Sequence, residues 1–266
     1  MKLALVQMLV TNSKEENVKK ACMAIEISAQ KGAQMVVLPE MFACPYENHS
    51  FVQNAEEVSG FIYRNISQSA KENGVWVVTG SFPEREGEKL YNTSFVFDCA
   101  GREVARHRKL HLFDIDIEGG QHFCESDTFS AGDAITVFDT PFGRMGLMIC
   151  FDLRFGELSR TMALSGAKLL LAPAAFNKTT GPMHWDLLLR ARAVDNGVFV
   201  AAVSPARNEK ASYIAYGHSA LVSPWGEFVC RMGDDEAITI TDVDFPLVDA
   251  VRRQLPILSA RRTDLY

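Results

Sequence analysis

Apolar and polar residues follow one another along this chain in blocks that predict alternating strands and helices. Residues 3–8 form a short apolar run, which predicts a buried strand. Ser13, followed three residues later by Glu16, forms a capping box and predicts the start of a helix. Apolar residues from Val18 to Ala29 recur on one face of this helix, as an amphipathic helix requires.

The same alternation continues along the chain. In the first half it predicts strands at 35–39, 75–82 and 91–98, and a helix over 60–72. In the second half it predicts strands at 144–150, 167–173 and 198–204, and helices over about 156–165 and from Pro182 onward. A hairpin over 218–230 turns at Pro224, Trp225 and Gly226, and a strand over 237–245 closes the sheet.

Strands that alternate with helices indicate an α/β protein. The order strand, helix, strand, helix, strand, strand occurs twice, which suggests two similar layers packed face to face. No long linker or low-complexity stretch interrupts the 266 residues, and 47% of them are hydrophobic, enough to bury a large core. We therefore expect residues 1–266 to form a single domain.

Charge and cysteine usage narrow the class of protein. The net charge is −6, and no basic patch with interleaved aromatic residues stands out, so we expect no nucleic-acid partner. No apolar run approaches the roughly 20 residues that cross a bilayer, and we read the opening "MKLALVQMLV" as a buried strand rather than a signal peptide. The six cysteines are widely spaced, which favours reduced thiols and a cytoplasmic location.

Three residues that are candidates for catalysis stand after apolar strands or extended runs. Glu40 ends "MVVLPE", Cys150 ends "GLMIC", and Lys109 lies in "ARHRKLHLFD" after the strand at 91–98. Ligands of α/β sheets gather at the carboxyl ends of the strands, so these positions can converge. A thiolate attacks a carbonyl carbon, a carboxylate relays the proton, and a fixed ammonium stabilises the oxyanion.

Each of the three residues also has a plain structural interpretation. A single cysteine at a strand end is usually inert packing, a glutamate there is usually a solvated cap, and a lysine in a basic run usually faces solvent. These interpretations weaken when all three residue types occur together. A helix after Cys150 would direct its N-terminus at the sulfur and lower the pKa of the thiol. The backbone N–H of Phe151 would then serve as an oxyanion donor.

The stretches "LPEMF", "RKLHLFD" and "MICFDLRF" resemble the three signature stretches of the nitrilase (carbon–nitrogen hydrolase) superfamily. The resemblance implies a catalytic set of Glu40, Lys109 and Cys150, and a four-layer α-β-β-α sandwich. A second glutamate of that superfamily often lies between the lysine and the cysteine. The stretch "FCES" resembles that element and places it at Glu125.

Longer stretches, among them "HLFDIDIEGGQHFCES" and "ASYIAYGHSALVSPWGE", resemble the ω-amidase branch of the Nit2 type across essentially the whole chain. Three stretches of the chain depart from that pattern. Ala172 and Ala174 stand where a tyrosine and a glycine are usual, Phe151 replaces a tyrosine, and the loop "IEGGQHF" lacks an expected proline. These departures leave the catalytic set intact and bear on substrate preference.

The resemblance implies hydrolysis of the ω-amide of a small dicarboxylate, such as 2-oxoglutaramate or succinamate, through a cysteine thioester. Glu40 would relay protons, Lys109 and the Phe151 N–H would stabilise the oxyanion, and Glu125 would orient the substrate and Lys109 or share proton transfer. The free carboxylate of such a substrate needs a cation. Arg154 has the matching planar fork, although it is equally consistent with pairing to Asp152 or Glu157.

Further residues are candidates for the substrate pocket. Phe176, Asn177 and Thr179 follow a strand, and Tyr46 lies near Glu40. Core packing is the simpler interpretation of Phe176 and Tyr46. Neither metal-ligand spacing nor a phosphate-binding glycine motif is present, so we expect no metal and no cofactor.

Other functions remain open from the sequence. Within the superfamily, the chain is also compatible with a deaminated-glutathione amidase, an N-carbamoyl hydrolase or a true nitrilase. Outside enzymology, a catalytically silent binding protein of this fold is the alternative, although all three catalytic residue types are present. The family resemblance implies a homodimer or larger homo-oligomer. The tail "LPILSARRTDLY" mixes apolar and basic residues and could reach across such an interface; the alternative is a tail packed on its own subunit.

Overall fold

The computed structural model describes residues 1–118 and 122–265, and two β-sheets form its centre. The strands of the first sheet are β1 (Lys2–Gln7), β2 (Met35–Val37), β3 (Trp76–Val78), β4 (Phe82–Glu86), β5 (Lys89–Phe97), β6 (Glu103–Arg108) and β15 (Ala237–Asp242). Their order is β15-β1-β2-β3-β5-β4, with β6 paired to β5.

The second sheet is built from the later part of the chain. Its strands are β9 (Thr136–Thr140), β10 (Gly143–Leu147), β11 (Leu169–Pro173), β12 (Phe199–Val203), β13 (Ala220–Val222) and β14 (Phe228–Arg231). Their order is β14-β13-β12-β11-β10-β9. A separate short hairpin pairs β7 (Asp114–Asp116) with β8 (His122–Cys124).

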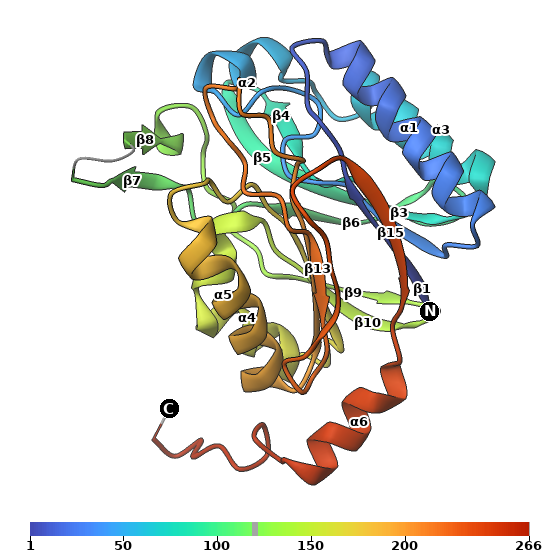
Figure 1. The fold of residues 1–266 in the computed structure, drawn as a ribbon, viewed down its shortest axis with the longest axis vertical. Coiled ribbons are helices and arrows are strands. Elements are labelled where there is room, and N and C mark those ends of the chain that lie inside the picture. The colour runs from blue at the N-terminus through green and yellow to red at the C-terminus, as the bar shows by residue number, and fades with distance from the viewer. Residues whose placement is uncertain (119–121, 266) are drawn as a thin grey trace.

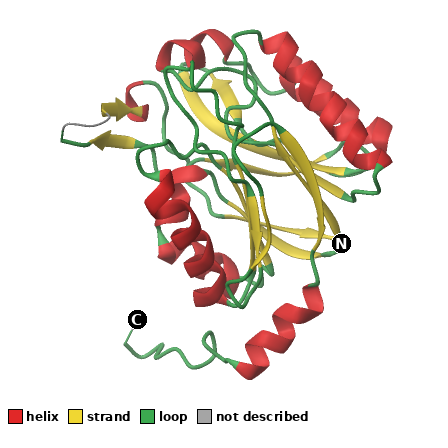
Figure 2. Ribbon diagram, viewed as in Figure 1, coloured by secondary structure: helices red, strands yellow, loops and turns green. Residues whose placement is uncertain are grey.

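Helices cover the outer faces of the two sheets (Figures 1 and 2). Two helices, α1 (Lys14–Gln30) and α3 (Phe61–Asn73), cover the first sheet, while α4 (Gly156–Leu164) and α5 (Gly181–Asn196) cover the second. The remaining helical segments are α2 (Asn48–Asn54), α6 (Phe245–Gln254) and two 3-10 turns, η1 (Glu125–Asp127) and η2 (Cys150–Arg154). No helix among the described residues is long and apolar enough to span a membrane.

Side-chain alternation along the strands explains the layering. On β1, Leu3 and Leu5 point between the sheets, where they meet residues of the second sheet such as Leu169 and Leu171. The alternate residues Ala4 and Val6 belong to the cluster beneath α1 and α3. A third apolar cluster lies between the second sheet and the helices α4 and α5. The predicted four-layer sandwich is therefore confirmed.

The parallel strands bring their carboxyl ends to the same part of the fold. In the first sheet β1, β2 and β3 run parallel, and in the second sheet β10, β11 and β12 do so. Residues that follow these strands can therefore meet, although they are far apart in sequence.

Several predicted elements differ in detail. The stretch 75–82, predicted as one strand, is divided between β3 and β4 by a bend at residues 79–81. The last strand, β15, does not close the second sheet but pairs antiparallel with β1 in the first, and α6 begins at Phe245. At α1, Ser13 accepts the predicted bond from the Glu16 N–H, but the Glu16 carboxylate accepts from Thr11 instead of completing the capping box. The loop "IEGGQHF", which lacks the expected proline, includes residues 119–121, and these lie outside the described residues.

Gly80 is the residue that permits the bend after β3. Its φ of +65° lies in the left-handed region, and a Cβ built there would stand 2.0 Å from the carbonyl oxygen of Pro39. The neighbouring Ser81 hydroxyl accepts a hydrogen bond from the Met41 N–H, at 3.1 Å. The bend therefore packs on the residues that flank Glu40 and holds them in place.

Candidate active site

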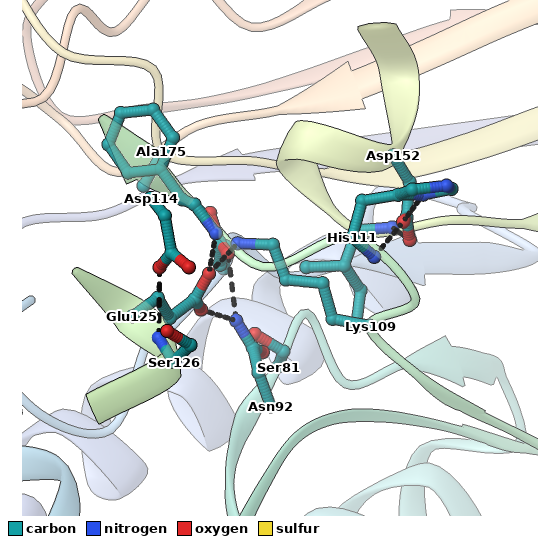
Figure 3. Close-up of polar contacts among 12 residues, drawn as sticks. Ser81, Asn92, Lys109, His111, Asp114, Glu125, Ser126, Asp152 and Ala175 are labelled. Atoms are coloured by element: carbon teal, nitrogen blue, oxygen red, sulfur yellow. Dashed lines mark hydrogen bonds and ion pairs between the residues drawn. The ribbon is translucent and has the colours of Figure 1, made fainter. Parts of the chain in front are cut away.

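Three of the predicted catalytic residues meet in a fully buried polar cluster. Glu40 follows β2, Lys109 directly follows β6, and Glu125 begins the turn η1 after β8. The Lys109 Nζ lies 3.0 Å from Glu40 Oε1 and 2.8 Å from Glu125 Oε2. None of the three side chains is exposed to solvent. Figure 3 shows the lysine side chain reaching toward the Glu125 carboxylate.

The two carboxylates share one lysine, so the cluster carries an excess of negative charge if both are ionised. Burial alone lowers the pKa of the Lys109 ammonium, but Glu125 and Glu40 together hold that pKa above its usual value. Lys109 is therefore a fixed cation at neutral pH. Burial raises the pKa of Glu40, and Lys109 only partly opposes this shift. Glu40 is accordingly a carboxylate with an increased tendency to accept a proton.

Neutral hydrogen-bond donors complete the cluster. The Asn92 amide on β5 donates to Glu40 Oε1 at 2.9 Å and to Glu125 Oε1 at 3.0 Å. The Tyr46 hydroxyl lies 3.5 Å from Glu40 Oε1 and 3.4 Å from Glu125 Oε1, and the Phe113 N–H donates to Glu125 Oε2 at 2.6 Å. These donors offset the cost of burying a second carboxylate.

Cys150 stands beside this cluster in a strained backbone conformation. Its φ is +47°, which is uncommon for a residue other than glycine, and the thiol is 3% exposed. Burial raises the pKa of the Cys150 thiol well above its ordinary value, and the nearby Glu40 carboxylate raises it further. The backbone N–H of Ala175, after β11, donates toward the sulfur.

The expectation that a helix dipole lowers the pKa of this thiol is wrong. Residues 150–154 form only a 3-10 turn, and the α-helix α4 begins at Gly156, six residues after the sulfur-bearing residue. The dipole effect is confined to the first turn of a helix, so burial and the adjacent negative charge dominate. The resting thiol is therefore protonated and needs a base.

A base stands at the required place. The Oε2 atom of Glu40 is buried and has no hydrogen-bond partner among the described residues, and the Glu40 carboxylate interacts with the Cys150 thiol. Phe151 lies at the start of the turn η2, where N–H groups have no partner within the turn. Base, nucleophile, cation and backbone donor can thus act on one carbonyl group.

A cavity of about 320 Å³ leads from the surface to this cluster. Glu40, Tyr46 and Ala175 lie at its inner end, and the segment after β12 contributes Tyr213 to its wall. The Tyr213 ring stacks on Tyr46 with centroids 4.4 Å apart, and its hydroxyl donates to the Ala175 carbonyl oxygen. Tyr213 thus ties the cavity wall to the residue whose N–H faces the nucleophile.

Arg154 does not make the alternative pairs considered for it. Its Nη1 contacts His184 Nδ1 at 3.1 Å and its Nη2 donates to the Thr180 hydroxyl at 3.4 Å, while no described carboxylate forms an ion pair with it. The guanidinium lies over the rings of Phe151 and Phe176, 5.5 and 4.7 Å from their centroids. Its Nε is buried without a hydrogen-bond partner among the described residues.

The other residues predicted for the substrate pocket have mixed positions. Phe176 is buried and packs edge-on against Trp185, with centroids 5.1 Å apart. The Asn177 side chain accepts bonds from the Thr179 and Thr180 N–H groups and holds the segment before α5. Thr179 itself is exposed, and its neighbour Thr180 is the residue that contacts Arg154.

Sequence reasoning missed three residues at the site. Asn92 stands beside Thr93 and Ser94 in the strand "YNTSFVF", and the sequence offers no signal that separates it from a polar residue facing solvent. Tyr213 lies on a connecting segment whose path a sequence pattern does not reveal. Asp152, two residues after the cysteine, was considered only as a partner of Arg154, yet it accepts hydrogen bonds from His107 and His111.

Comparison with known proteins gives consistent results. The sequence profile described as "Carbon-nitrogen hydrolase" matches residues 2–253. The Omega-amidase NIT2 of Xenopus tropicalis is 50% identical over 265 residues, which cover 100% of this chain and 96% of that protein. The crystal structure of Saccharomyces cerevisiae Nit3, a member of branch 10 of the nitrilase superfamily, superposes with a TM-score of 0.90 at 37% identity. That match covers 98% of this chain and 96% of Nit3.

A more distant structure carries chemical information. A mutant amidase from Nesterenkonia sp. AN1, 26% identical with a TM-score of 0.84, shows the result of Michael addition of acrylamide at its active-site cysteine. The match covers 100% of this chain and 98% of that protein.

Proposed function

Because the chain belongs to the carbon–nitrogen hydrolase family, we propose that it is an ω-amidase, which releases ammonia from the terminal amide of a small dicarboxylate monoamide. It is a hydrolase that acts on carbon–nitrogen bonds other than peptide bonds. One observation carries the proposal: the buried Glu40–Lys109–Cys150 arrangement occurs in a chain that is half-identical over its full length to proteins named as ω-amidases.

The proposed reaction begins with the protonated thiol. Glu40 takes the proton from Cys150 as the sulfur attacks the amide carbonyl carbon. The oxyanion that forms is stabilised by the Lys109 ammonium and the Phe151 N–H. Glu40 then delivers the proton to the leaving nitrogen, the carbon–nitrogen bond breaks, and ammonia leaves behind a thioester on Cys150.

Hydrolysis of the thioester follows the same path in reverse. Glu40 removes a proton from a water molecule, the resulting hydroxide attacks the thioester carbonyl, and the carboxylic acid leaves as the thiol is restored. Glu125 keeps Lys109 in place through the 2.8 Å ion pair. The raised pKa of Glu40 suits a group that must both accept and release a proton.

Arg154 is the proposed site for the free carboxylate of the substrate. Its hydrogen bonds go to His184 and Thr180 rather than to an acid, so no described carboxylate neutralises its charge. The buried Nε without a partner can donate to a carboxylate oxygen. Phe176 supports the guanidinium, Asn177 and Thr179 shape the adjoining segment, and Tyr46 lines the cavity near Glu40.

We further propose that residues 1–266 form one domain and that the protein acts in the cytoplasm as a homodimer or larger homo-oligomer. The six free cysteines support a reducing compartment. On α5, Met183 is 67% and Leu187 is 64% exposed, and a contiguous exposed apolar face of this kind favours association. Leu265, in the segment after α6, is 69% exposed and supports an extended tail that contacts a second subunit.

A substrate panel tests the proposed function. Purified protein is assayed for ammonia release from succinamate, 2-oxoglutaramate, uncharged amides, carbamoyl amino acids and nitriles, with Cys150→Ala as the control. We expect the ω-amides to be preferred and the variant to be inactive. Preference for a carbamoyl amino acid or a nitrile would replace the ω-amidase assignment by another branch of the family. Turnover by Cys150→Ala at the wild-type rate would reject the nucleophile.

A further inference from the structure

Asp152 is a buried carboxylate that the proposed reaction does not use. Its Oδ1 accepts from the His111 N–H at 2.9 Å and from His111 Nδ1 at 2.7 Å. Its Oδ2 accepts from His107 Nε2 at 2.9 Å and from the Ile149 N–H at 3.1 Å. Four donors saturate the carboxylate, which explains why its pKa lies well below the usual range although burial alone raises it.

The donors come from the two segments that carry the nucleophile and the cation. His107, on β6, and His111 flank Lys109 at two residues on either side, so both imidazoles belong to the segment that carries the cation. Ile149 immediately precedes Cys150 and is the residue on which the turn η2 begins. Figure 3 shows Asp152 and His111 together on the side of Lys109 away from Glu125. One carboxylate therefore connects the two segments across the sheets.

The hydrogen bonds of Asp152 hold the strained backbone conformation of Cys150. A positive φ at a residue other than glycine persists only where the surroundings hold it. The Asp152 bonds hold the turn on both sides of the cysteine: directly at the preceding Ile149 N–H, and through the backbone of Asp152 itself, whose N–H donates to the Ile149 carbonyl.

His107 has a hydrogen-bond partner at each of its ring nitrogens. Thr136 Oγ1 lies 3.0 Å from His107 Nδ1 and donates its single hydrogen to the Arg106 carbonyl oxygen, at 3.0 Å. The hydroxyl must then accept from His107 Nδ1. Because His107 Nε2 faces a carboxylate oxygen, these contacts are all satisfied when both ring nitrogens carry hydrogens. The ring is fully buried, so its charge is balanced locally by Asp152.

We propose that Asp152, His107 and His111 form a positioning unit that holds Cys150 in register with Lys109, and that His107 serves in it as a buried imidazolium. The inference rests on the proposed function only in assigning Cys150 as the nucleophile. The unit has no contact with the carboxylates of Glu40 and Glu125, so it acts through the geometry of the nucleophile. Its loss should lower kcat and leave KM nearly unchanged.

The test compares His111→Ala, which removes a donor to Asp152, with His111→Asn, whose amide nitrogen replaces Nδ1. Active sites are counted by titration of Cys150 so that kcat refers to folded enzyme. We expect kcat to fall roughly 100-fold in His111→Ala, as for a misplaced reacting group, with KM within about threefold. His111→Asn should recover most of the loss. Equal kcat per active site in both variants and the wild type, with only a lower melting temperature, would overturn the proposal.

Two readouts do not depend on which amide is the substrate. The rate at which iodoacetamide alkylates Cys150 should fall in His111→Ala in parallel with kcat. The exposed Cys99 is the internal control and should react at its wild-type rate. An unchanged rate at Cys150 would contradict the proposal that the unit positions the nucleophile. If the wild type hydrolyses no amide of the panel, the proposed function fails while this measurement still judges the positioning unit. In ¹⁵N spectra of histidine-labelled wild-type protein, we expect the signals of one imidazole ring with both nitrogens protonated. These signals should be missing from the spectrum of His107→Gln. An unprotonated nitrogen in the His107 ring would reject the imidazolium.

Discussion

Replacing Asn92 by leucine removes a side-chain amide that donates to both Glu40 and Glu125 without greatly changing the volume of the side chain. Asn92 Nδ2 lies 2.9 Å from Glu40 Oε1 and 3.0 Å from Glu125 Oε1, and the residue is fully buried. Both bonds stabilise the ionised carboxylates. Their loss therefore raises further the pKa of Glu40, which burial already raises.

The expected shift follows from the strength of these bonds. A hydrogen bond to a charged group contributes roughly 1.5–3 kcal/mol, and one pKa unit corresponds to about 1.4 kcal/mol. A protonated carboxyl group keeps part of each bond, so we expect the apparent pKa of the carboxylate pair to rise by about one unit. The proposed reaction needs ionised Glu40, so we expect activity to be lost as the pH falls through the pKa of Glu40. The acid limb of the profile should therefore move to higher pH.

The assay is the pH dependence of kcat/KM for an ω-amide, followed by ammonia release, because this profile reports the free enzyme. Ser94→Ala is the matched control: Ser94 lies two residues along β5 on the same face, and its buried hydroxyl has no hydrogen-bond partner among the described residues. The control should leave the acid limb in place. An acid limb in Asn92→Leu that is unmoved or moved to lower pH, in a folded protein, would refute the reasoning.

Three further predictions concern the scaffold, the specificity and the assembly. Gly80→Ala should lower the free energy of unfolding, measured in urea, by about 3 kcal/mol because the new Cβ would meet the Pro39 carbonyl. Gly87→Ala is the control: Gly87 also has a positive φ but faces open space, so this variant should lose clearly less stability. Equal losses of stability in the two variants would exclude the clash as the cause. Arg154→Lys should raise KM for ω-amides about tenfold or more and leave uncharged amides nearly unaffected; equal effects on both would exclude a carboxylate site. Leu187→Glu on α5 should reduce the molar mass measured by light scattering, whereas Met23→Glu, on the exposed side of α1, should not; an unchanged mass in Leu187→Glu would place the interface elsewhere.

The sequence allowed the order of strands and helices to be predicted because each element has a periodic pattern, whereas the four-layer stacking was implied by the family resemblance. The buried strands are short apolar runs, and the outer helices have one apolar face. Glu40 and Cys150 were recognisable as candidates because each directly follows such a run, whereas Lys109 lies in a basic stretch after the strand at 91–98. Glu125 follows a three-residue strand outside both sheets, so only the family resemblance pointed to it.

Other properties depend on contacts between distant segments and leave no local pattern. The pKa of the Cys150 thiol was predicted to be lowered but is raised, because it depends on burial and on Glu40, which is 110 positions away in the chain. Asn92 is indistinguishable in sequence from a polar residue on the solvent side of a strand. The pairing of β15 with β1 joins the first and the last strand of the chain, and the short-range hydrophobic pattern of either strand does not indicate its partner.

The return of β15 to the first sheet has a consequence for how the protein is made. β1 pairs with β15 over its whole length, from Lys2 opposite Asp242 to Gln7 opposite Ala237. Until residue 242 has left the ribosome, β1 keeps one row of backbone N–H and C=O groups unpaired, and such an edge invites pairing with other chains. The first sheet therefore cannot be completed during synthesis of the first half, and its closure is a late, long-range step that exposes the nascent chain to aggregation.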